Sequence, residues 1–109
     1  MVRVGDVFLR SLEKPVILWL LSRKPMHGYE ITVEFKRLTG RKLKPSIVYP
    51  FLRRLEVEGF ASGEWIVKGR RKMRHYQLTK NGEELLRKVQ EMFKKPIKEF
   101  LLDIIGKEQ

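Results

Sequence analysis

The stretch Lys44–Gly59, KPSIVYPFLRRLEVEG, predicts a helix with an unusual interruption. Pro45 suits the first turn of a helix, and Gly59 suits the position just past its end. Pro50 lies inside, where it removes one backbone hydrogen bond and leaves the carbonyl of Ser46 without its helical partner. Two interpretations are open: the proline tilts the first turn, or it fills a gap between helices.

This predicted helix has two unlike faces. At 100° per residue, one sector collects the apolar side chains Val48, Phe51, Leu52 and Leu55. The other side carries a hydroxyl, a phenol and a guanidinium, from Ser46, Tyr49 and Arg53. We therefore expect the helix to bury one face and to offer the other to a partner.

The charge of the chain indicates what that partner is. The 109 residues carry 24 Lys and Arg against 13 Asp and Glu, a net charge of +11. Twelve of these cations and only three of the acids fall between Lys36 and Tyr76. Such a surplus favours nucleic acid as the partner, and an anionic membrane surface second.

Other classes of protein have little support in the sequence. Cysteine is absent, which excludes disulfides and thiolate metal sites. The longest apolar run, Val16–Leu21, is too short to cross a bilayer, and no signal peptide is evident. His27 and His75 lack ligand spacing, and no nucleophile–base pair or phosphate-binding loop is found. We expect a soluble cytoplasmic protein without catalytic activity, metal or cofactor.

The first half of the chain reads as helices. An apolar pattern starts at Val4 and leads into PVILWLL from Pro15, which we interpret as a buried helix. The segment SRKPMHG is a predicted loop. A second helical face follows, and Gly40 stands where a left-handed cap is expected. A short basic turn then leads to Lys44–Gly59.

The second half predicts a hairpin and a long helix. FASGEWIV and MRHYQL are rich in aromatic and β-branched residues and flank the basic turn KGRRK. Thr79 is placed to cap a C-terminal helix, which Pro96 should kink or split. The fold class is thus mainly α with a small β-hairpin: a winged helix-turn-helix, residues 1–80, plus a C-terminal dimerisation helix, residues 81–109.

Three segments, PMHGYEI, YPFLRRLEVEGF and RRKMRHYQLTKNGEELL, closely resemble signature segments of the PadR family of transcriptional regulators. The resemblance covers about Val16–Leu86. It implies a homodimeric winged-helix DNA-binding protein of the compact subgroup, with a C-terminal helix that pairs the subunits. It also implies a repressor, of a family in which some members respond to small aromatic or drug-like ligands.

The start of the recognition helix departs from the family pattern of Ser, Pro, Gly and Thr. Here these positions are Lys44, Pro45, Ser46 and Ile47. A lysine cannot cap a helix N-terminus. We therefore expect the contact between this helix start and a DNA phosphate to be shared between the charge of Lys44 and the hydroxyl of Ser46. We also expect the preferred base sequence to differ from that of other family members.

These considerations predict three sets of site residues. The residues expected to contact DNA are Lys42, Lys44, Ser46, Tyr49, Arg53, Lys68, Arg70, Arg71, Lys72 and Arg74. The residues expected at a homodimer interface are Val4, Val7, Phe8, Val89, Met92, Phe93, Ile97, Phe100, Leu101 and Ile104. The candidate walls of a ligand pocket at the dimer seam are Phe8, Trp65, Met92 and Phe93.

Two other functions remain open at this stage. One is a sensor of small molecules of the multidrug type, with its pocket at the dimer seam. The other is a basic architectural protein that binds nucleic acid without sequence specificity. RNA is disfavoured, because few aromatic residues can be placed on an exposed strand face for base stacking.

Overall fold

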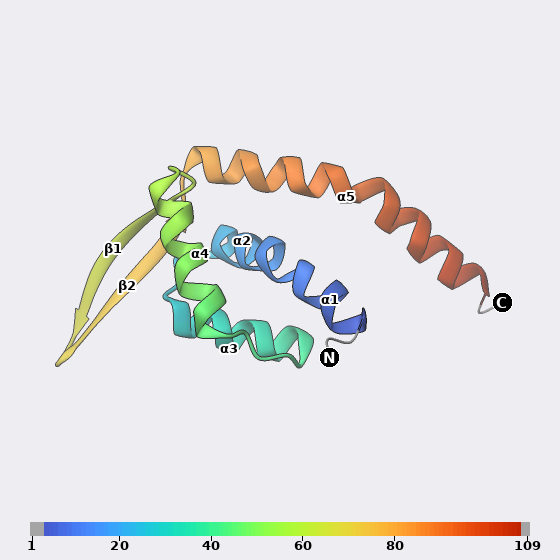
Figure 1. Ribbon diagram of the computed structural model, residues 1–109. Helices are drawn as coiled ribbons and strands as arrows, with labels where there is room; N and C mark the ends of the chain where they lie inside the picture. The colour runs from blue at the N-terminus through green and yellow to red at the C-terminus, as the bar shows by residue number, and fades with distance from the viewer. Residues whose placement is uncertain (1–3, 108–109) are drawn as a thin grey trace.

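The computed structural model describes residues 4–107, apart from the side chains at positions 5, 6, 8 and 107. Phe8, predicted for both the interface and the ligand pocket, therefore has a side chain outside the described part. The elements in chain order are α1 (Val4–Ser11), α2 (Glu13–Arg23), α3 (Gly28–Thr39), α4 (Pro45–Val57), β1 (Ala61–Lys68), β2 (Arg71–Leu78) and α5 (Lys80–Lys107). Helices and one hairpin in this order confirm the predicted winged helix-turn-helix with a long C-terminal helix (Figure 1).

The core lies where α2, α3 and α4 meet. Its fully buried side chains are Ile17, Leu20, Ile31, Leu43, Val48 and Leu52. Val48 and Leu52 belong to the stripe predicted for α4, and Leu55 of the same stripe is buried as well. The stripe therefore does fix which face of α4 turns inward.

The ends of α3 and α4 follow local rules. Gly40 caps α3 with φ of 77°, and Gly59 follows α4 with φ of 82°, both in the left-handed region that glycine adopts without strain. Lys44 precedes α4 without a side-chain cap, as expected. Pro50 leaves α4 unbroken and lies exposed, so the interpretation that it fills a gap between helices is wrong.

The N-terminal apolar pattern forms two helices. Leu12 separates α1 from α2, although its backbone stays near helical values. Pro15 has no N–H to donate to the carbonyl of Ser11, so the hydrogen-bond ladder cannot run continuously through this point. The sequence periodicity alone does not reveal this interruption.

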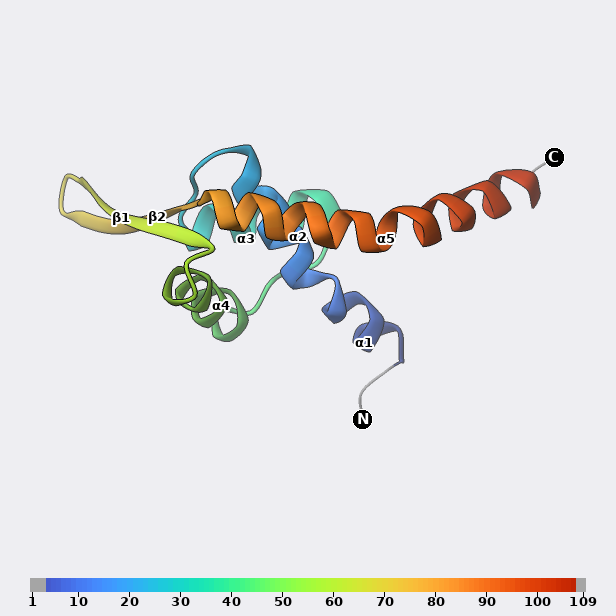
Figure 2. The ribbon, with the colours of Figure 1, turned by 90° about the horizontal axis from the view of Figure 1, so that it is seen from above.

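β1 and β2 form a tightly closed antiparallel hairpin. Lys68 pairs with Arg71, so the turn contains only Gly69 and Arg70, two residues in place of the five suggested by KGRRK. Gly69 has φ of 61°. A positive φ at the first central residue is typical of a type II′ turn, whose twist matches that of paired strands. The hairpin reaches well beyond the helices (Figures 1 and 2).

The base of the hairpin is joined to the loop before α3. Met26 and Tyr76 exchange both backbone hydrogen bonds, at 3.0 and 2.8 Å. This short bridge gives the hairpin a third strand-like contact at its base. It places the middle of β2 directly beside the start of α3.

α5 begins as predicted and then leaves the domain. The Thr79 hydroxyl oxygen accepts the N–H of Gly82 at 3.1 Å, which makes Thr79 the N-cap. The helix is continuous through Pro96 and bends in its course (Figure 1). Its C-terminal part extends away from the rest of the molecule (Figure 2). The longest axis of the whole molecule, with α5 included, measures 56 Å. No helix within residues 4–107 is both long and apolar enough to cross a membrane.

Candidate nucleic-acid interface

α4 exposes the polar face that its sequence predicts. Ser46, Tyr49 and Arg53 all lie exposed, on the side opposite to the buried stripe. Tyr49 keeps 51% of its surface accessible, which is high for a tyrosine. The hydroxyl and guanidinium groups are therefore available to a partner that approaches α4.

A groove of about 820 Å³ lies between α4, the start of α3 and the hairpin. Tyr49 and Arg53 line it from α4, and Trp65, Lys72 and Arg74 line it from the hairpin. The structure thus brings two predicted contact regions, the helix and the wing, to one concave surface. Aromatic and cationic side chains in one groove suit the sugars, bases and phosphates of nucleic acid.

The remaining predicted contact residues lie around this groove. Lys42 and Lys44 precede α4, and Lys68, Arg70 and Arg71 occupy the tip of the hairpin. All five side chains are exposed. The cations therefore extend from the start of α4 to the far end of the wing.

Arg74 differs from the other cations, because it is bound within the protein. Its Nε donates to Glu56 Oε1 at 3.1 Å, and its Nη2 donates to Glu56 Oε2. Its guanidinium also lies 5.1 Å from the centre of the Trp65 ring and 5.9 Å from that of Tyr76. This arrangement joins the wing to α4 and gives Arg74 an intramolecular role that the sequence does not predict.

The Glu56–Arg74 pair shifts the pKa of the Glu56 carboxyl. The hydrogen bonds from Arg74 hold the pKa of the Glu56 carboxyl below its ordinary value of 4.5, against an opposing effect of burial. Burial in the same region raises the pKa of the Tyr76 hydroxyl. Because the pKa of Glu56 is lower in the folded chain, the pair stabilises the fold above that ordinary value and loses this effect as pH falls through the folded pKa.

We expect Glu56→Gln to loosen the wing without unfolding the domain. DNA affinity should fall about three- to tenfold, because binding then has to order a hairpin that is no longer fixed to α4. The acid limb of the stability–pH profile should also become flatter, since one depressed carboxyl is gone. Gel shifts and urea unfolding between pH 3 and pH 7, roughly the range over which carboxylates titrate, provide the two readouts.

Glu58→Gln is the matched control for this change. Glu58 lies one position past the end of α4 and accepts a hydrogen bond from Arg54 at 2.7 Å, but this pair does not reach the wing. An equal loss of affinity in both variants would show that the position of the wing is not responsible, because the loss of a negative charge by itself favours DNA binding.

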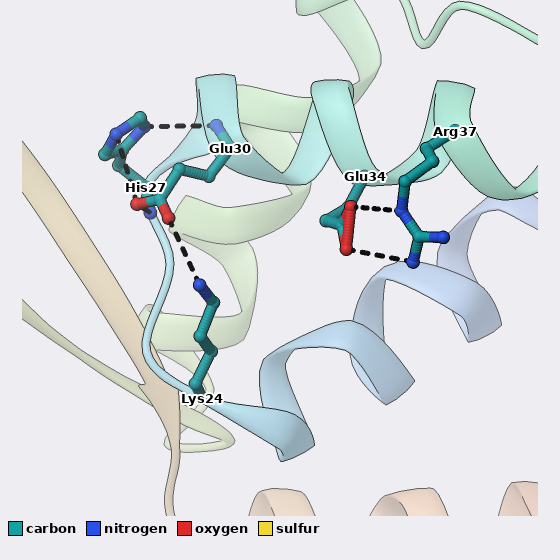
Figure 3. A network of polar contacts seen from close by, with 5 residues as sticks. All are labelled: Lys24, His27, Glu30, Glu34 and Arg37. Atoms are coloured by element: carbon teal, nitrogen blue, oxygen red, sulfur yellow. Dashed lines mark hydrogen bonds and ion pairs between the residues drawn. The ribbon is translucent and has the colours of Figure 1, made fainter.

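The start of α3 packs against the candidate contact residue Tyr49. Gly28 is buried, and a Cβ atom at this position would overlap the Tyr49 ring. His27, just before it, forms a capping box: its Nδ1 accepts the Glu30 N–H at 3.2 Å, and Glu30 faces the His27 backbone N–H at 3.5 Å (Figure 3). His27 is therefore the residue that caps the start of α3.

The predicted interface residues give α5 an apolar surface, and two of them lie on α1. Met92, Phe93, Ile97, Phe100, Leu101 and Ile104 on α5, and Val4 and Val7 on α1, are all exposed. Val89 of the same set is half-buried. Between α2 and α5 this surface is hollowed into an apolar groove of about 610 Å³, lined by Trp19, Phe93 and Ile97 among others.

Among the described side chains, three predicted walls of the ligand pocket, Trp65, Met92 and Phe93, do not share a groove in a single chain. Trp65 lines the groove beside α4, whereas Phe93 lines the apolar groove beside α2. Met92 is 70% exposed and lines neither of these two grooves. A pocket shared between two subunits at the dimer seam stays a prediction.

The buried helices, the exposed face of α4 and the basic hairpin together define a winged helix-turn-helix protein with the surface of a DNA-binding domain. The family model "Transcriptional regulator PadR-like family" matches residues 17–88. The chain belongs to this family, whose members are transcriptional regulators and not enzymes.

Solved structures of transcriptional regulators are similar to this chain. A PadR family transcriptional regulator from Eggerthella lenta is 26% identical, with a TM-score of 0.71 over 95% of this chain and 89% of that one. Bacillus subtilis PadR, solved in complex with operator DNA, is 32% identical, with a TM-score of 0.63 over 72% of this chain and 45% of that one. A transcriptional regulator from Clostridium thermocellum shares the fold, with 24% identity and a TM-score of 0.72 over 97% of both chains. No curated protein matches the sequence.

Proposed function

We propose that this chain is a homodimeric, sequence-specific repressor that binds a palindromic operator. The observation that carries the proposal is the groove in which exposed Tyr49 and Arg53 of α4 face Lys72 of the wing. α4 has the position of a recognition helix, which enters the major groove, and the hairpin has that of a wing, which grips the adjoining backbone. The operator complex of the Bacillus subtilis relative supports this assignment.

The start of α4 supports a contact with phosphate. Lys44 and Ser46 are exposed at the helix N-terminus, where backbone N–H groups and the helix dipole favour anions. In this proposal Lys44 supplies charge, and Ser46 supplies a hydroxyl donor. Lys42, Lys68, Arg70 and Arg71 extend the positive surface to either side.

The apolar surface of α5 supports the dimer. Phe93, Ile97, Phe100 and Ile104 follow spacings of four, three and four residues, the pattern of a seam between helices. Left uncovered, such a surface would be an aggregation site. A two-fold axis through this seam presents both recognition helices to one side of a duplex, about 34 Å apart.

Arg71→Ala should weaken DNA binding alike on all sequences. Arg71 lies exposed at the tip of the wing, where it can reach phosphates and is remote from the α5 seam. For six phosphate contacts per dimer we expect a log–log salt slope of roughly −5, and the variant should lower its magnitude by about one for each phosphate that Arg71 neutralises. Gel-shift titrations on specific and random duplexes measure this, with light scattering to confirm that the dimer persists.

Selection from random duplexes tests the proposal as a whole. Enrichment of a palindrome is the expected result, and it would distinguish a specific regulator from an architectural protein. Binding that does not depend on salt would contradict the nucleic-acid interface itself. A protein of this function acts where the DNA lies, so we assign it to the cytoplasm.

A second function, a response to hydrophobic ligands, is favoured by the apolar groove between α2 and α5. Trp19 lines this groove and Trp65 does not, so Trp65→Phe isolates the relevant fluorescence. Quenching of this variant by hydrophobic dyes, with a change in DNA affinity, is the result that this function requires.

A further inference from the structure

His27, Glu30 and His75 form a cluster that the sequence does not indicate. His27 and Glu30 belong to the start of α3, and His75 lies in the middle of β2. Their ligand atoms, one from each residue, all lie within 4.8 Å of one another. The separation of the two histidines in sequence, which argued against a metal site, is overcome by the neighbouring Met26–Tyr76 bridge.

One atom of this cluster has no partner in the described part of the chain. The Nε2 of His75 is buried and makes no hydrogen bond there. The His75 ring instead meets the His27 ring edge-on, with 5.1 Å between their centres. Buried polar atoms in folded proteins almost always have a partner, so this nitrogen indicates a missing one.

We propose that His27, Glu30 and His75 bind a divalent transition metal ion of the zinc type. Two imidazoles and one carboxylate are a known ligand set for Zn²⁺, with a fourth position left for water. Zinc–nitrogen bonds of about 2.0–2.1 Å in a tetrahedral site place the ligand atoms about 3.3 Å apart. Small side-chain rotations bring atoms that lie within 4.8 Å to this spacing.

Binding of the metal requires His27 to exchange tautomer. Its Nδ1 accepts the Glu30 N–H, so the proton of the neutral ring lies on Nε2, 3.1 Å from Glu30 Oε1. A metal at Nε2 replaces that proton, and Nδ1 then carries the ring proton and no longer caps α3. The metal therefore competes with the capping box.

Glu30 also changes its partner. Its Oε2 lies 3.8 Å from Nζ of Lys24, whose side chain is 64% exposed (Figure 3). The metal displaces this lysine from the carboxylate. Because Gly28 lies between the cluster and Tyr49, an altered start of α3 is transmitted to the recognition helix.

Titration with Co²⁺, a coloured substitute for Zn²⁺, tests the proposal in the tag-free protein without DNA. We expect one ion per chain and the visible absorption of a tetrahedral site. His75→Phe should weaken binding more than about tenfold. Gln77→Phe is the control, because it places the same side chain on the same strand at an exposed position.

Lys24→Ala gives a second test that does not depend on the stability of the His75 variant. Removal of the competing cation should tighten Co²⁺ binding about two- to fivefold. The absence of saturable binding, or equal affinity in His75→Phe and the unmodified chain, would overturn the metal site. Such a failure would leave the proposed DNA interface untouched, because DNA is absent from the measurement.

Discussion

Phe100→Asp should convert the protein into a monomer or an aggregate and abolish operator binding. Phe100 lies on the apolar surface of α5, and in a single chain it is 63% exposed. In the proposed dimer the aspartate would be buried without a partner, which costs roughly several kcal/mol of association free energy. All DNA-facing residues remain unchanged, so a loss of binding would be an effect of the seam alone.

Leu102→Asp is a closely matched control. Leu102 is 58% exposed and lies two residues further along α5, roughly 200° around the helix axis from Phe100. We expect this variant to stay dimeric and to bind the operator normally, as judged by light scattering and gel shift. A dimeric Phe100→Asp protein with normal DNA binding would mean that the interface lies on another surface.

Gly82→Ala should have the largest effect on the stability of the fold. Gly82 is buried in the first turn of α5, and a Cβ atom there would overlap the carbonyl oxygen of Phe60. That carbonyl accepts the Thr79 N–H at 3.1 Å, so the backbone cannot yield without loss of the junction between the hairpin and α5. We expect a loss of about 3 kcal/mol, the upper part of the usual cost of overpacking.

Thermal unfolding at a fixed protein concentration measures this loss, which should lower Tm by more than about 10 °C. Gly106→Ala is the control on the same helix, because a Cβ atom there meets nothing within 4 Å. It should leave stability unchanged or raise it by about 0.5–1 kcal/mol. Equal Tm values for Gly82→Ala and the unmodified protein would show that the junction tolerates a shift of its backbone.

The features that the sequence predicts are those set by neighbours along the chain. The caps at Gly40 and Thr79, the buried stripe of α4 and the two strands each depend on a few consecutive residues. Their physics is local, so a pattern of residue types is enough. The resemblance of three segments to one family then identifies how the elements are arranged.

The features that the sequence does not predict arise from contacts between residues far apart in the chain. Arg74 binds Glu56, which lies 18 positions earlier in the sequence. His75 and His27 are separated by more positions still, and their rings meet because the bridge between Met26 and Tyr76 brings the two segments together. The basic turn predicts Arg74 as a DNA contact, but the sequence does not reveal that its guanidinium also binds Glu56. Likewise the sequence does not reveal that Trp65 lies against Lys72 and Arg74 in the groove beside α4.

The length of α5 has a consequence for the spacing of the operator. In the proposed dimer, the length and helical twist of α5 fix the distance and the rotation between each winged helix-turn-helix domain and the dimer seam. One residue inserted between Leu86 and Phe93 would advance the seam by about 1.5 Å and turn it by about 100°. In that dimer, the separation of the two half-sites on DNA depends partly on a stretch of helix that contacts no base. The bend in α5 sets the angle between the two α5 helices where they meet (Figure 1).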